Sequence, residues 1–325
     1  MPVSPIFHVA VLGAGAWGTA LALAAHTAGR TTTLWVREDD VLAALRTGGE
    51  NRFLPGVKLP ADMIVTGALE DAAKADALLV VVPAQVLHGF LDSLKPLLRP
   101  GQPVVICAKG IEKTSGKLVT EVADEAAPDA ALAILSGPSF ARDVALGLPT
   151  AVTIAAKGDL AEGLQTALGS ATFRPYATDD MTGVALGGAA KNVYAIACGV
   201  VEGLGLGENA RAALLARSFA ELARLGEAIG ARRETLMGLS GLGDLVLTAT
   251  SKSSRNFSYG VALGSDTAPS GKLAEGVDTA PALVTRAKAA GVEMPIAEAV
   301  ADLLSGKLPA GEAAMRLMSR KLTSE

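Results

Sequence analysis

Short runs of aliphatic and β-branched residues alternate with alanine- and leucine-rich stretches through the first half of the chain. The runs predict strands and the stretches between them predict helices, a pattern typical of an α/β fold with a mostly parallel, doubly wound sheet. From about Asp180 onward hydrophobic residues recur every three or four positions instead, which predicts helix after helix. The predicted strands are 6–12, 31–36, 77–82, 103–107, 132–135 and 150–155.

The change of pattern predicts two domains, an α/β domain over 1–179 and an all-α domain over 180–325. No Pro- or Ser-rich linker separates them. The Gly/Ser/Thr-rich stretch 251–271 is predicted to be a mobile or functional loop. One helix of the second domain is expected to begin at a cap formed by Asn209. Its apolar face is Leu215, Phe219, Leu222, Gly226 and Ile229.

Composition restricts the classes of partner. Half of the 325 residues are hydrophobic and the mean hydropathy is +0.37, enough for a sizeable core. The net charge of −4 gives no overall attraction for nucleic acid or anionic membranes. The most apolar run, 77–82, ends at Pro83 and is far shorter than the ~20 residues that a membrane span needs. An anionic ligand therefore has to be held by a local cluster.

The termini and cysteines predict a cytoplasmic protein. Met1 leads through a short neutral stub into the first strand, with no basic segment or cleavage site of a signal peptide. Cys107 and Cys198 are too few for a disulfide framework and fit small core positions in a reducing compartment. No CxxC or HExxH spacing indicates a metal site.

A glycine pattern lies between the first strand and the first helix. Gly13, Gly15 and Gly18 form GxGxxG, and a second strand, 31–36, follows at the interval of a βαβ unit. Such glycines allow a sharp turn, a close approach of backbone to a pyrophosphate, and tight packing of strand on helix. The pattern predicts a Rossmann-like dinucleotide site, with a tight turn of some other α/β protein as the alternative.

The end of the second strand bears on the choice of dinucleotide. Folds that prefer NAD place an acidic residue there, whereas the sequence reads Leu34-Trp35-Val36-Arg37. Arg37 is able to face a 2′-phosphate, which makes NADP compatible, unless it is an ordinary surface arginine. The hypothesis predicts that Arg37→Asp lowers the ratio of kcat/KM for NADPH to that for NADH.

Two polar segments follow predicted strands, at the edge where open α/β sheets bind ligands. Lys109, after the strand 103–107, either reaches a ligand or is solvated. The turn 136–141 offers backbone N–H groups and hydroxyls to a small polar ligand. Ser139 lies in that turn, but no GxSxG surrounds it, so binding is favoured over nucleophilic catalysis.

A third candidate opens the helical domain. Gly187 and Gly188 precede Lys191 by one turn and weaken a helix by about 1 kcal/mol each, a cost that indicates close approach of another backbone or a ligand. Lys191 stands among small and apolar residues, where desolvation lowers a lysine pKa toward neutral pH. The alternative is that its ammonium reaches the surface. Asp244 is a lone carboxylate in an apolar loop, and 253–256 reads as a phosphate clamp around an arginine.

Five of these motifs occur in the order and spacing found in NAD(P)-dependent glycerol-3-phosphate dehydrogenases, and the chain resembles the bacterial biosynthetic form of that family over nearly its whole length. Two departures concern local packing only: Asp143 stands where the family often has Glu, and no cysteine occurs in 248–251. The motifs are Gly13-Ala14-Gly15-Ala16-Trp17-Gly18, Ser136-Gly137-Pro138-Ser139-Phe140-Ala141, Lys191-Asn192, Gly241-Leu242-Gly243-Asp244 and Ser254-Arg255-Asn256.

The resemblance implies which residues act. Contacts to NAD or NADP are expected from Gly13, Gly15, Ala16, Trp17, Gly18, Arg37, Lys109, Ala141, Arg255, Leu273 and Glu275. Contacts to the substrate are expected from Lys109, Gly137, Ser139, Lys191, Asp244, Ser254, Arg255 and Asn256. The catalytic residues are expected to be Lys191, Asp244 and Lys109, with no metal.

The implied reaction is reduction of dihydroxyacetone phosphate to sn-glycerol 3-phosphate for glycerophospholipid biosynthesis. Lys191 would supply the proton, and Lys191→Ala is predicted to lower kcat by ~10² or more. A homodimer is the default oligomer. Two rivals remain at this point: a dehydrogenase of hydroxy acids or sugar acids, which would need a carboxylate clamp, and a dinucleotide sensor, which would bind cofactor without turnover.

Overall fold

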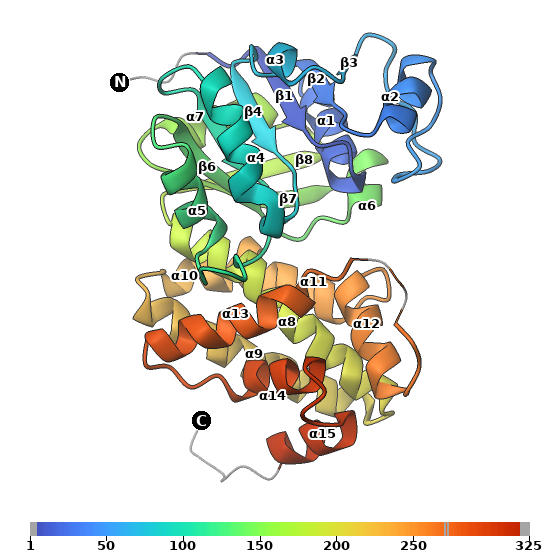
Figure 1. The fold of residues 1–325 in the computed structure, drawn as a ribbon, viewed down its shortest axis with the longest axis vertical. Helices are drawn as coiled ribbons and strands as arrows, with labels where there is room; N and C mark the ends of the chain where they lie inside the picture. The colour runs from blue at the N-terminus through green and yellow to red at the C-terminus, as the bar shows by residue number, and fades with distance from the viewer. Residues whose placement is uncertain (1–4, 270, 272, 319–325) are drawn as a thin grey trace. The chain divides into compact units, whose positions relative to one another are not determined.

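The computed structural model describes residues 5–269, 271 and 273–318 (Figure 1). Two compact units make up the chain, one of Met1–Ala108 with Val119–Val184 and one of Lys109–Leu118 with Ala185–Glu325. We call them unit 1 and unit 2. Parts of the predictions above fall on 1–4, Ser270 and 319–325, which lie outside the described residues. Unlike the predicted division at 179/180, the units are not two continuous stretches of sequence, because the ten residues after Ala108 group with the second.

Unit 1 contains one eight-stranded sheet. Its strands are β1 (His8–Leu12), β2 (Thr31–Trp35), β3 (Ile64–Thr66), β4 (Ala77–Val80), β5 (Pro103–Ile106), β6 (Ala131–Ser136), β7 (Thr150–Ala156) and β8 (Phe173–Thr178). The order is β3-β2-β1-β4-β5-β6-β7-β8, and neighbours are parallel except β6 and β7. This confirms the predicted mostly parallel, Rossmann-like sheet; β3 and β8 were not predicted.

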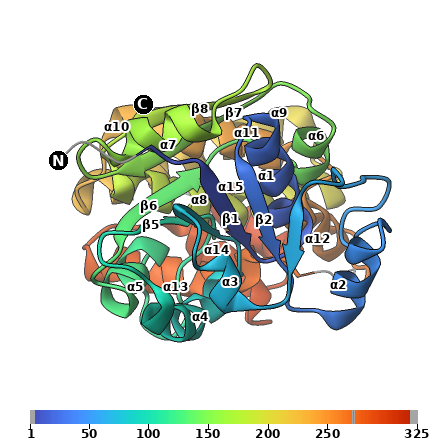
Figure 2. The ribbon, with the colours of Figure 1, turned by 90° about the horizontal axis from the view of Figure 1, so that it is seen from above.

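Helices cover both faces of the sheet. Figure 2 shows α1 and α7 on one face and α3, α4 and α5 on the other, as expected for a doubly wound fold. The helical segments of this unit are α1 (Ala16–Thr27), α2 (Asp39–Arg46), α3 (Leu69–Ala72), η1 (Ala84–Val86), α4 (Leu87–Leu94), η2 (Lys95–Leu97), α5 (Val119–Ala126), α6 (Ala141–Ala145) and α7 (Leu160–Leu168).

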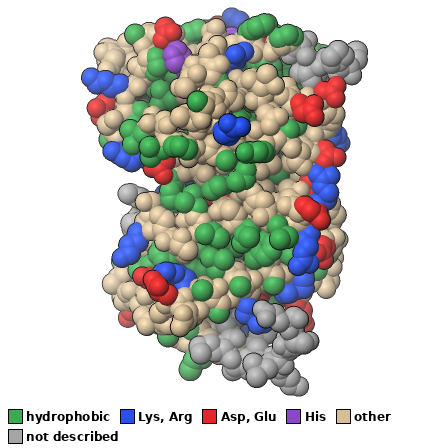
Figure 3. All heavy atoms as spheres, turned by 180° about the vertical axis from the view of Figure 1, so that it is seen from behind, with side chains coloured by type: hydrophobic (Ala, Val, Ile, Leu, Met, Phe, Trp, Pro, Cys, Tyr) green, Lys and Arg blue, Asp and Glu red, His purple; other side chains and the backbone are tan. Residues whose placement is uncertain are grey.

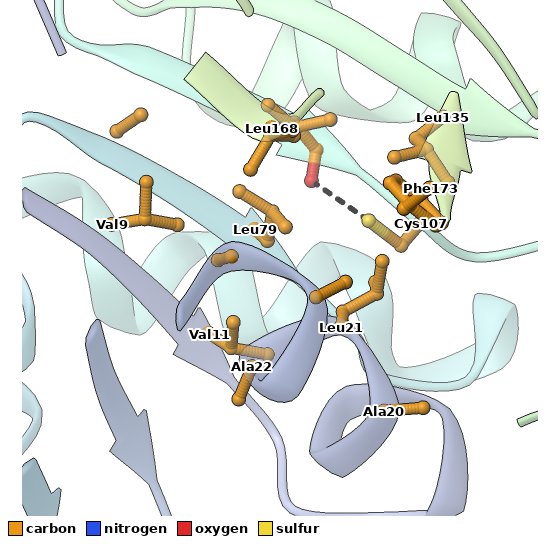
Figure 4. Packing of buried hydrophobic residues seen from close by; sticks show 14 of the residues in the cluster. Val9, Val11, Ala20, Leu21, Ala22, Leu79, Cys107, Leu135, Leu168 and Phe173 are labelled. Atoms are coloured by element: carbon orange, nitrogen blue, oxygen red, sulfur yellow. Dashed lines mark hydrogen bonds between the residues drawn. The ribbon is translucent and has the colours of Figure 1, made fainter. Parts of the chain in front are cut away.

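The core of unit 1 is mainly aliphatic. Figure 4 shows Leu21 of α1 and Leu168 of α7 packed toward Val11 of β1 and Leu79 of β4, all at most 1% exposed. Cys107 belongs to this core, where its thiol donates to the carbonyl of Val105, as the sequence predicted. The ends of the strands are thereby fixed by packing, and with them the loops that follow.

Unit 2 is helical in its described part. It contains most of α8 (Met181–Gly203), followed by α9 (Gly207–Ala228), α10 (Arg233–Met237), the π-helical turn η3 (Leu239–Gly243), α11 (Asp244–Ala249), α12 (Arg255–Gly264), α13 (Gly276–Ala289), α14 (Pro295–Leu304) and α15 (Ala310–Met318). Two predictions were wrong. Asn209 lies inside α9, whose first turn begins earlier, and the supposed loop 251–271 contains α12.

Four glycines bring α8 and α12 into backbone contact. A Cβ on Gly199 would meet the carbonyl oxygen of Phe257 at 2.1 Å, and a Cβ on Gly260 would meet that of Ile196 at 2.1 Å. Gly203 and Gly264 repeat the same approach one turn later. Each helix therefore offers two glycines four residues apart, and only a bare backbone fits there.

We expect Gly260→Ala to lower the free energy of unfolding by about 2 kcal/mol or more, because the obstacle is backbone and cannot swing away. Urea unfolding measures it. Gly311→Ala in α15 is the matched control, since nothing lies within 4 Å of its added Cβ, and helix propensity alone predicts a small gain in stability. Equal effects of the two substitutions would refute the close packing of α8 on α12.

Within the described residues, α8 is the one helix long and apolar enough to cross a membrane, and the window that passes the test is wholly buried in the protein. A helix covered by protein on all sides is expected to be apolar all round. Its composition is therefore accounted for by burial.

Candidate active site

Three charged side chains of unit 2 meet in the interior of the protein. The Asp244 carboxylate accepts from Lys191 Nζ at 2.6 Å with one oxygen and from Lys109 Nζ at 2.7 Å with the other. The side chains of Asp244, Lys191 and Lys109 are 2%, 9% and 13% exposed. The structure thus joins residues 53 and 135 positions apart in sequence, and it excludes both the surface position for Lys191 and the solvated position for Lys109.

Local sequence explains how each member reaches the cluster. Lys109 opens the loop 109–118, which folds back through a bridge between Ile111 and Leu118. Asp244 begins α11 directly after the π-helical turn η3. Lys191 lies on α8, one turn after Gly187, where a Cβ would meet the carbonyl oxygen of Ser240 at 2.7 Å. The close approach predicted at Gly187 is confirmed, and it brings the α8 backbone next to the turn that leads to Asp244.

Thr248 is a fourth member that the sequence reasoning missed. Its hydroxyl accepts from Lys191 Nζ at 3.0 Å and donates to Asp244 Oδ1 at 3.1 Å. Asp244 and Thr248 are four residues apart on α11, so their side chains share one face of that helix. This i, i+4 spacing was the available signal in the sequence.

The electrostatics of the cluster bring the pKa of one lysine close to neutral pH. Burial lowers the pKa of Lys191 to about 8, although the Asp244 carboxylate opposes the shift. Burial alone would raise the pKa of Asp244, but Lys109 and Lys191 outweigh it, and the pKa lies below its ordinary value. Asp244 is therefore an anion at neutral pH, while Lys191 exchanges its proton within reach of physiological pH.

The N-terminus of α12 lies in the same unit and is suited to an anion. The Ser254 hydroxyl caps the helix by accepting from Phe257 N at 3.2 Å, and Arg255 is its first residue, with an exposed side chain. No hydrogen bond or ion pair holds the Arg255 guanidinium in the described part of the chain. A cap, a helix dipole and an exposed arginine are the usual elements of a phosphate site.

Asn256 connects three segments in addition to any contact with a ligand. Its side chain donates to Asn192 Oδ1 at 2.9 Å and accepts from Gly276 N at 2.9 Å. Asn192 in turn donates to the carbonyl oxygen of Lys109 at 3.3 Å. The chain of amides fixes α12, α8 and the start of α13 to the loop that carries Lys109.

Two predicted cofactor residues lie just before α13. Leu273 is half exposed, and Glu275 is partly buried. Burial raises the pKa of the Glu275 carboxyl, against the pull of Arg255, Lys191 and Lys109. Glu275 is thus an additional acidic group close enough to the cluster to affect its charge.

The remaining predicted residues belong to unit 1. A Cβ on Gly13, whose φ is +121°, would meet the carbonyl oxygen of Val81 at 2.5 Å, and a Cβ on Gly18 would meet that of Gly13 at 1.8 Å. Gly15 precedes α1 with open space at its Cβ position, and the indole N–H of Trp17 is buried without a partner among the described residues. The turn is therefore tightly packed against the chain's own backbone at Gly13 and Gly18 and open at Gly15, and Ala16 begins the helix behind it.

Asn51 supports this turn and was not predicted. Its amide donates to the carbonyl of Ala14 and to the hydroxyl of Thr19, both at 2.8 Å. On the same sheet, β6 leads to Gly137, which has φ +146° and no room for a Cβ, and Ala141 begins α6. Ser139 donates its hydroxyl proton to the carbonyl of Gly137 at 2.9 Å, so this hydroxyl has a backbone partner.

Arg37 follows β2, as predicted, with an exposed side chain paired to Glu38. The structure therefore places the predicted residues in two sets, the glycine turn with Arg37, Gly137, Ser139 and Ala141 in unit 1, and the lysine cluster with 254–256, Leu273 and Glu275 in unit 2. Among the residues described, no group of three His, Cys, Asp or Glu side chains is placed to hold a metal ion.

Comparisons with known proteins identify the family of the chain. Residues 8–161 match the model of the NAD-dependent glycerol-3-phosphate dehydrogenase N-terminus, and residues 180–315 match that of the C-terminus. The chain is 58% identical over 319 residues to glycerol-3-phosphate dehydrogenase [NAD(P)+] of Bradyrhizobium sp. strain ORS 278, with 98% of each chain covered. A relative from Parvibaculum lavamentivorans with the same name is 54% identical, again with 98% coverage of both.

Solved structures give the same result. The crystal structure of glycerol-3-phosphate dehydrogenase from Coxiella burnetii superposes with a TM-score of 0.91 at 36% identity, covering 97% of this chain and 99% of that one. A ketopantoate reductase from Ralstonia eutropha shares the fold alone, with a TM-score of 0.63 at 14% identity over 94% of this chain and 99% of its own. The chain therefore belongs to the family of NAD(P)-dependent glycerol-3-phosphate dehydrogenases, oxidoreductases that act on a CH–OH group.

Proposed function

We propose that this chain reduces dihydroxyacetone phosphate to sn-glycerol 3-phosphate with NADPH or NADH, and runs the reverse oxidation. The observation that carries the proposal is the buried Lys191–Asp244–Lys109 cluster, because a lysine with a pKa of about 8 that is held by a carboxylate is a suitable proton donor for a carbonyl reduction. The product is a precursor of glycerophospholipids, which places the reaction in lipid synthesis.

Unit 1 holds the dinucleotide in this proposal. The glycine turn and the N-terminus of α1 bind the pyrophosphate, and Arg37 lies at the end of β2, where the adenosine ribose binds in such folds. When bound, the reduced nicotinamide supplies the hydride. Gly137, Ser139 and Ala141 line the turn after β6, at the same carboxyl edge of the sheet.

Lys191 gives a proton to the carbonyl oxygen of the substrate. An N–H bond of the ammonium breaks as the O–H bond of the alcohol forms, and the resulting amine takes the proton back when the reaction runs as oxidation. Asp244 and Thr248 hold the nitrogen in place through contacts of 2.6 and 3.0 Å. Lys109, bound to the other carboxylate oxygen, orients the carbonyl group by its positive charge.

The phosphate of the substrate binds at α12. Its first turn presents backbone N–H groups and a positive dipole end, and Arg255 adds a guanidinium that is able to form two parallel bonds. Ser254 contributes as the cap, and Asn256 has one amide hydrogen beyond those engaged with Asn192. Together these groups fit the phosphate of dihydroxyacetone phosphate.

A spectrophotometric assay tests the proposal. Purified protein is mixed with dihydroxyacetone phosphate and NADPH, then NADH, and the loss of nicotinamide absorbance is followed, with ketopantoate and other 2-oxo acids as competing substrates. Turnover of dihydroxyacetone phosphate but not of the 2-oxo acids supports the proposed reaction. Turnover of oxo acids instead favours the hydroxy-acid rival, and tight cofactor binding with no turnover of any substrate favours the sensor.

The pH dependence should differ between the two directions. As pH rises through the Lys191 pKa of about 8, the ammonium needed for reduction is lost, so kcat/KM for reduction falls. The amine needed for oxidation appears over the same range, so kcat/KM for oxidation rises. Mirror-image profiles measured between pH 6 and 10 check this. Two profiles with the same slope would indicate that another group carries the proton.

A homodimer and a cytoplasmic location complete the proposal. A closed two-fold dimer is the commonest arrangement for an enzyme of this size, and light scattering after gel filtration measures whether the chain forms one.

On the face in Figure 3 acidic and basic side chains are interspersed. That face therefore has no continuous positive surface that would attract nucleic acid.

A further inference from the structure

An ion pair lies where β2 ends. Leu12 is paired in register with Trp35, and Gly13 N donates to the carbonyl of Trp35 at 3.2 Å. Arg37 and Glu38 follow within three residues, so they occupy the same edge of the sheet as the glycine turn. Glu38 is also 20 positions after Gly18, the interval at which an acidic residue binds the ribose of NAD in such folds.

The two side chains are bonded to each other. Both Nε and a terminal nitrogen of Arg37 donate to one oxygen of Glu38, at 3.2 and 2.8 Å. Arg37 is 75% exposed and Glu38 only 26%. Glu38 immediately precedes α2 but makes no capping bond to it. Arg37 is therefore the more exposed of the two side chains, and its pairing with Glu38 is the interaction that a ligand of Arg37 has to break.

We propose that Glu38 sets the balance between NAD(H) and NADP(H) by competing for Arg37, an inference that rests on the dinucleotide site proposed above. With NAD(H), Glu38 accepts a hydrogen bond from the ribose 2′-hydroxyl while Arg37 stays paired to it. With NADP(H), Arg37 leaves Glu38 to bind the 2′-phosphate, and the carboxylate opposes the added charge. One pair thus admits both cofactors and favours neither strongly.

Because acidic residues directly follow Arg37 in the chain, binding of a 2′-phosphate depends on this competition. Asp39 and Asp40 begin α2, and Asp40 is paired with Arg52 at 2.7 Å. Residues 37–40 thus contain three carboxylates and one guanidinium, and Arg52 adds a second guanidinium that Asp40 already engages. The net charge does not attract a 2′-phosphate, so its binding depends on releasing Arg37 from Glu38.

Binding of nucleotide fragments tests the inference without requiring turnover. Dissociation constants for 2′,5′-ADP and 5′-AMP, and for NADPH and NADH, are measured by calorimetry on the wild-type chain, Glu38→Gln, Arg37→Gln and the double variant. We expect Glu38→Gln to shift the preference toward the 2′-phosphorylated ligands by about tenfold, and Arg37→Gln to shift it the other way. In the Arg37→Gln background the effect of Glu38→Gln should shrink, because no arginine remains to be released.

Glu227→Gln is the matched control, since Glu227 forms an exposed pair with Arg233 at 3.2 Å in unit 2, and the preference should not change. Equal changes for both classes of ligand in Glu38→Gln, or none, would overturn the role of Glu38 while leaving the proposed function intact. Failure of the wild-type chain to bind either fragment would overturn both.

Discussion

Lys191→Ala is expected to lower kcat for reduction of dihydroxyacetone phosphate by about 10² or more, because it removes the ammonium, with a pKa of about 8, that gives its proton to the carbonyl oxygen. Affinity for NADPH should change little, since the glycine turn belongs to unit 1. Steady-state kinetics and cofactor titration measure the two effects separately. Small primary amines added to the variant should restore part of the rate, which a purely structural role for Lys191 would not allow.

The control for this variant is Lys307→Ala, an exposed lysine in unit 2 whose loss should leave kcat unchanged. Lys191→Arg keeps the charge but not the accessible pKa, so it should remain slow. A decrease of less than tenfold in Lys191→Ala would instead assign the proton to water or to Lys109.

Asp244→Asn should lower the free energy of unfolding by about 3–5 kcal/mol at pH 7, because it leaves two buried ammonium groups without their shared carboxylate. The pKa of Lys191 should fall further, since its largest favourable charge is removed. The loss of stability relative to the wild-type chain should then diminish as pH rises from the lowered Lys191 pKa of the variant to the wild-type pKa of about 8, and stay constant above it. Urea unfolding at pH 7 and pH 9.5 measures both effects.

Asp302→Asn is the matched control, because Asp302 pairs with Arg316 near the surface at 3.3 Å, where an ion pair contributes at most about 1 kcal/mol. If Asp244→Asn were no more destabilising than this variant, the buried cluster would not be a stabilising unit. If the loss in free energy of unfolding stayed constant with pH, the buried charge of Lys191 would not be the cause of the destabilisation.

The predictable part of the fold was its central strands. Buried parallel strands are continuous apolar runs, and six of these were readable. β8 was hidden because its residues alternate between buried and exposed and include Pro175, which an edge strand tolerates. β3 is only three residues long. Both lie at the ends of the sheet, where the hydrophobic signal is weakest.

The helical unit was harder to predict in detail. Asn209 is a favourable cap residue, yet α9 begins at Gly207, so tertiary packing decided the first turn. The glycines and serines of 251–271 suggested a loop, whereas Gly260 and Gly264 are required for α12 to contact α8. The pairs Gly199/Gly203 and Gly260/Gly264 stand four apart in the sequence, a signal of close helix packing that was available.

The candidate site was predicted residue by residue only through family resemblance. Local pattern pointed to Lys191 because glycines precede it, but nothing local joins it to Lys109 or Asp244, since side chains so distant in sequence meet only after folding. Thr248 and Asn51 were missed because a threonine and an asparagine are common in ordinary helices and loops. Their roles depend on partners that only the folded chain brings within reach.

The loop 109–118 has a consequence for the modularity of this enzyme. Lys109 lies in the first half of the chain but folds into unit 2. The helical unit is therefore discontinuous in sequence, and no single continuous segment of the chain contains it without part of unit 1. A fragment of 185–325 contains Asp244 and Lys191 but lacks Lys109, and a chimera that exchanges the C-terminal half between relatives takes its Lys109 from the other parent. Recombination between family members is thus constrained to keep that ten-residue loop matched to the helices it joins.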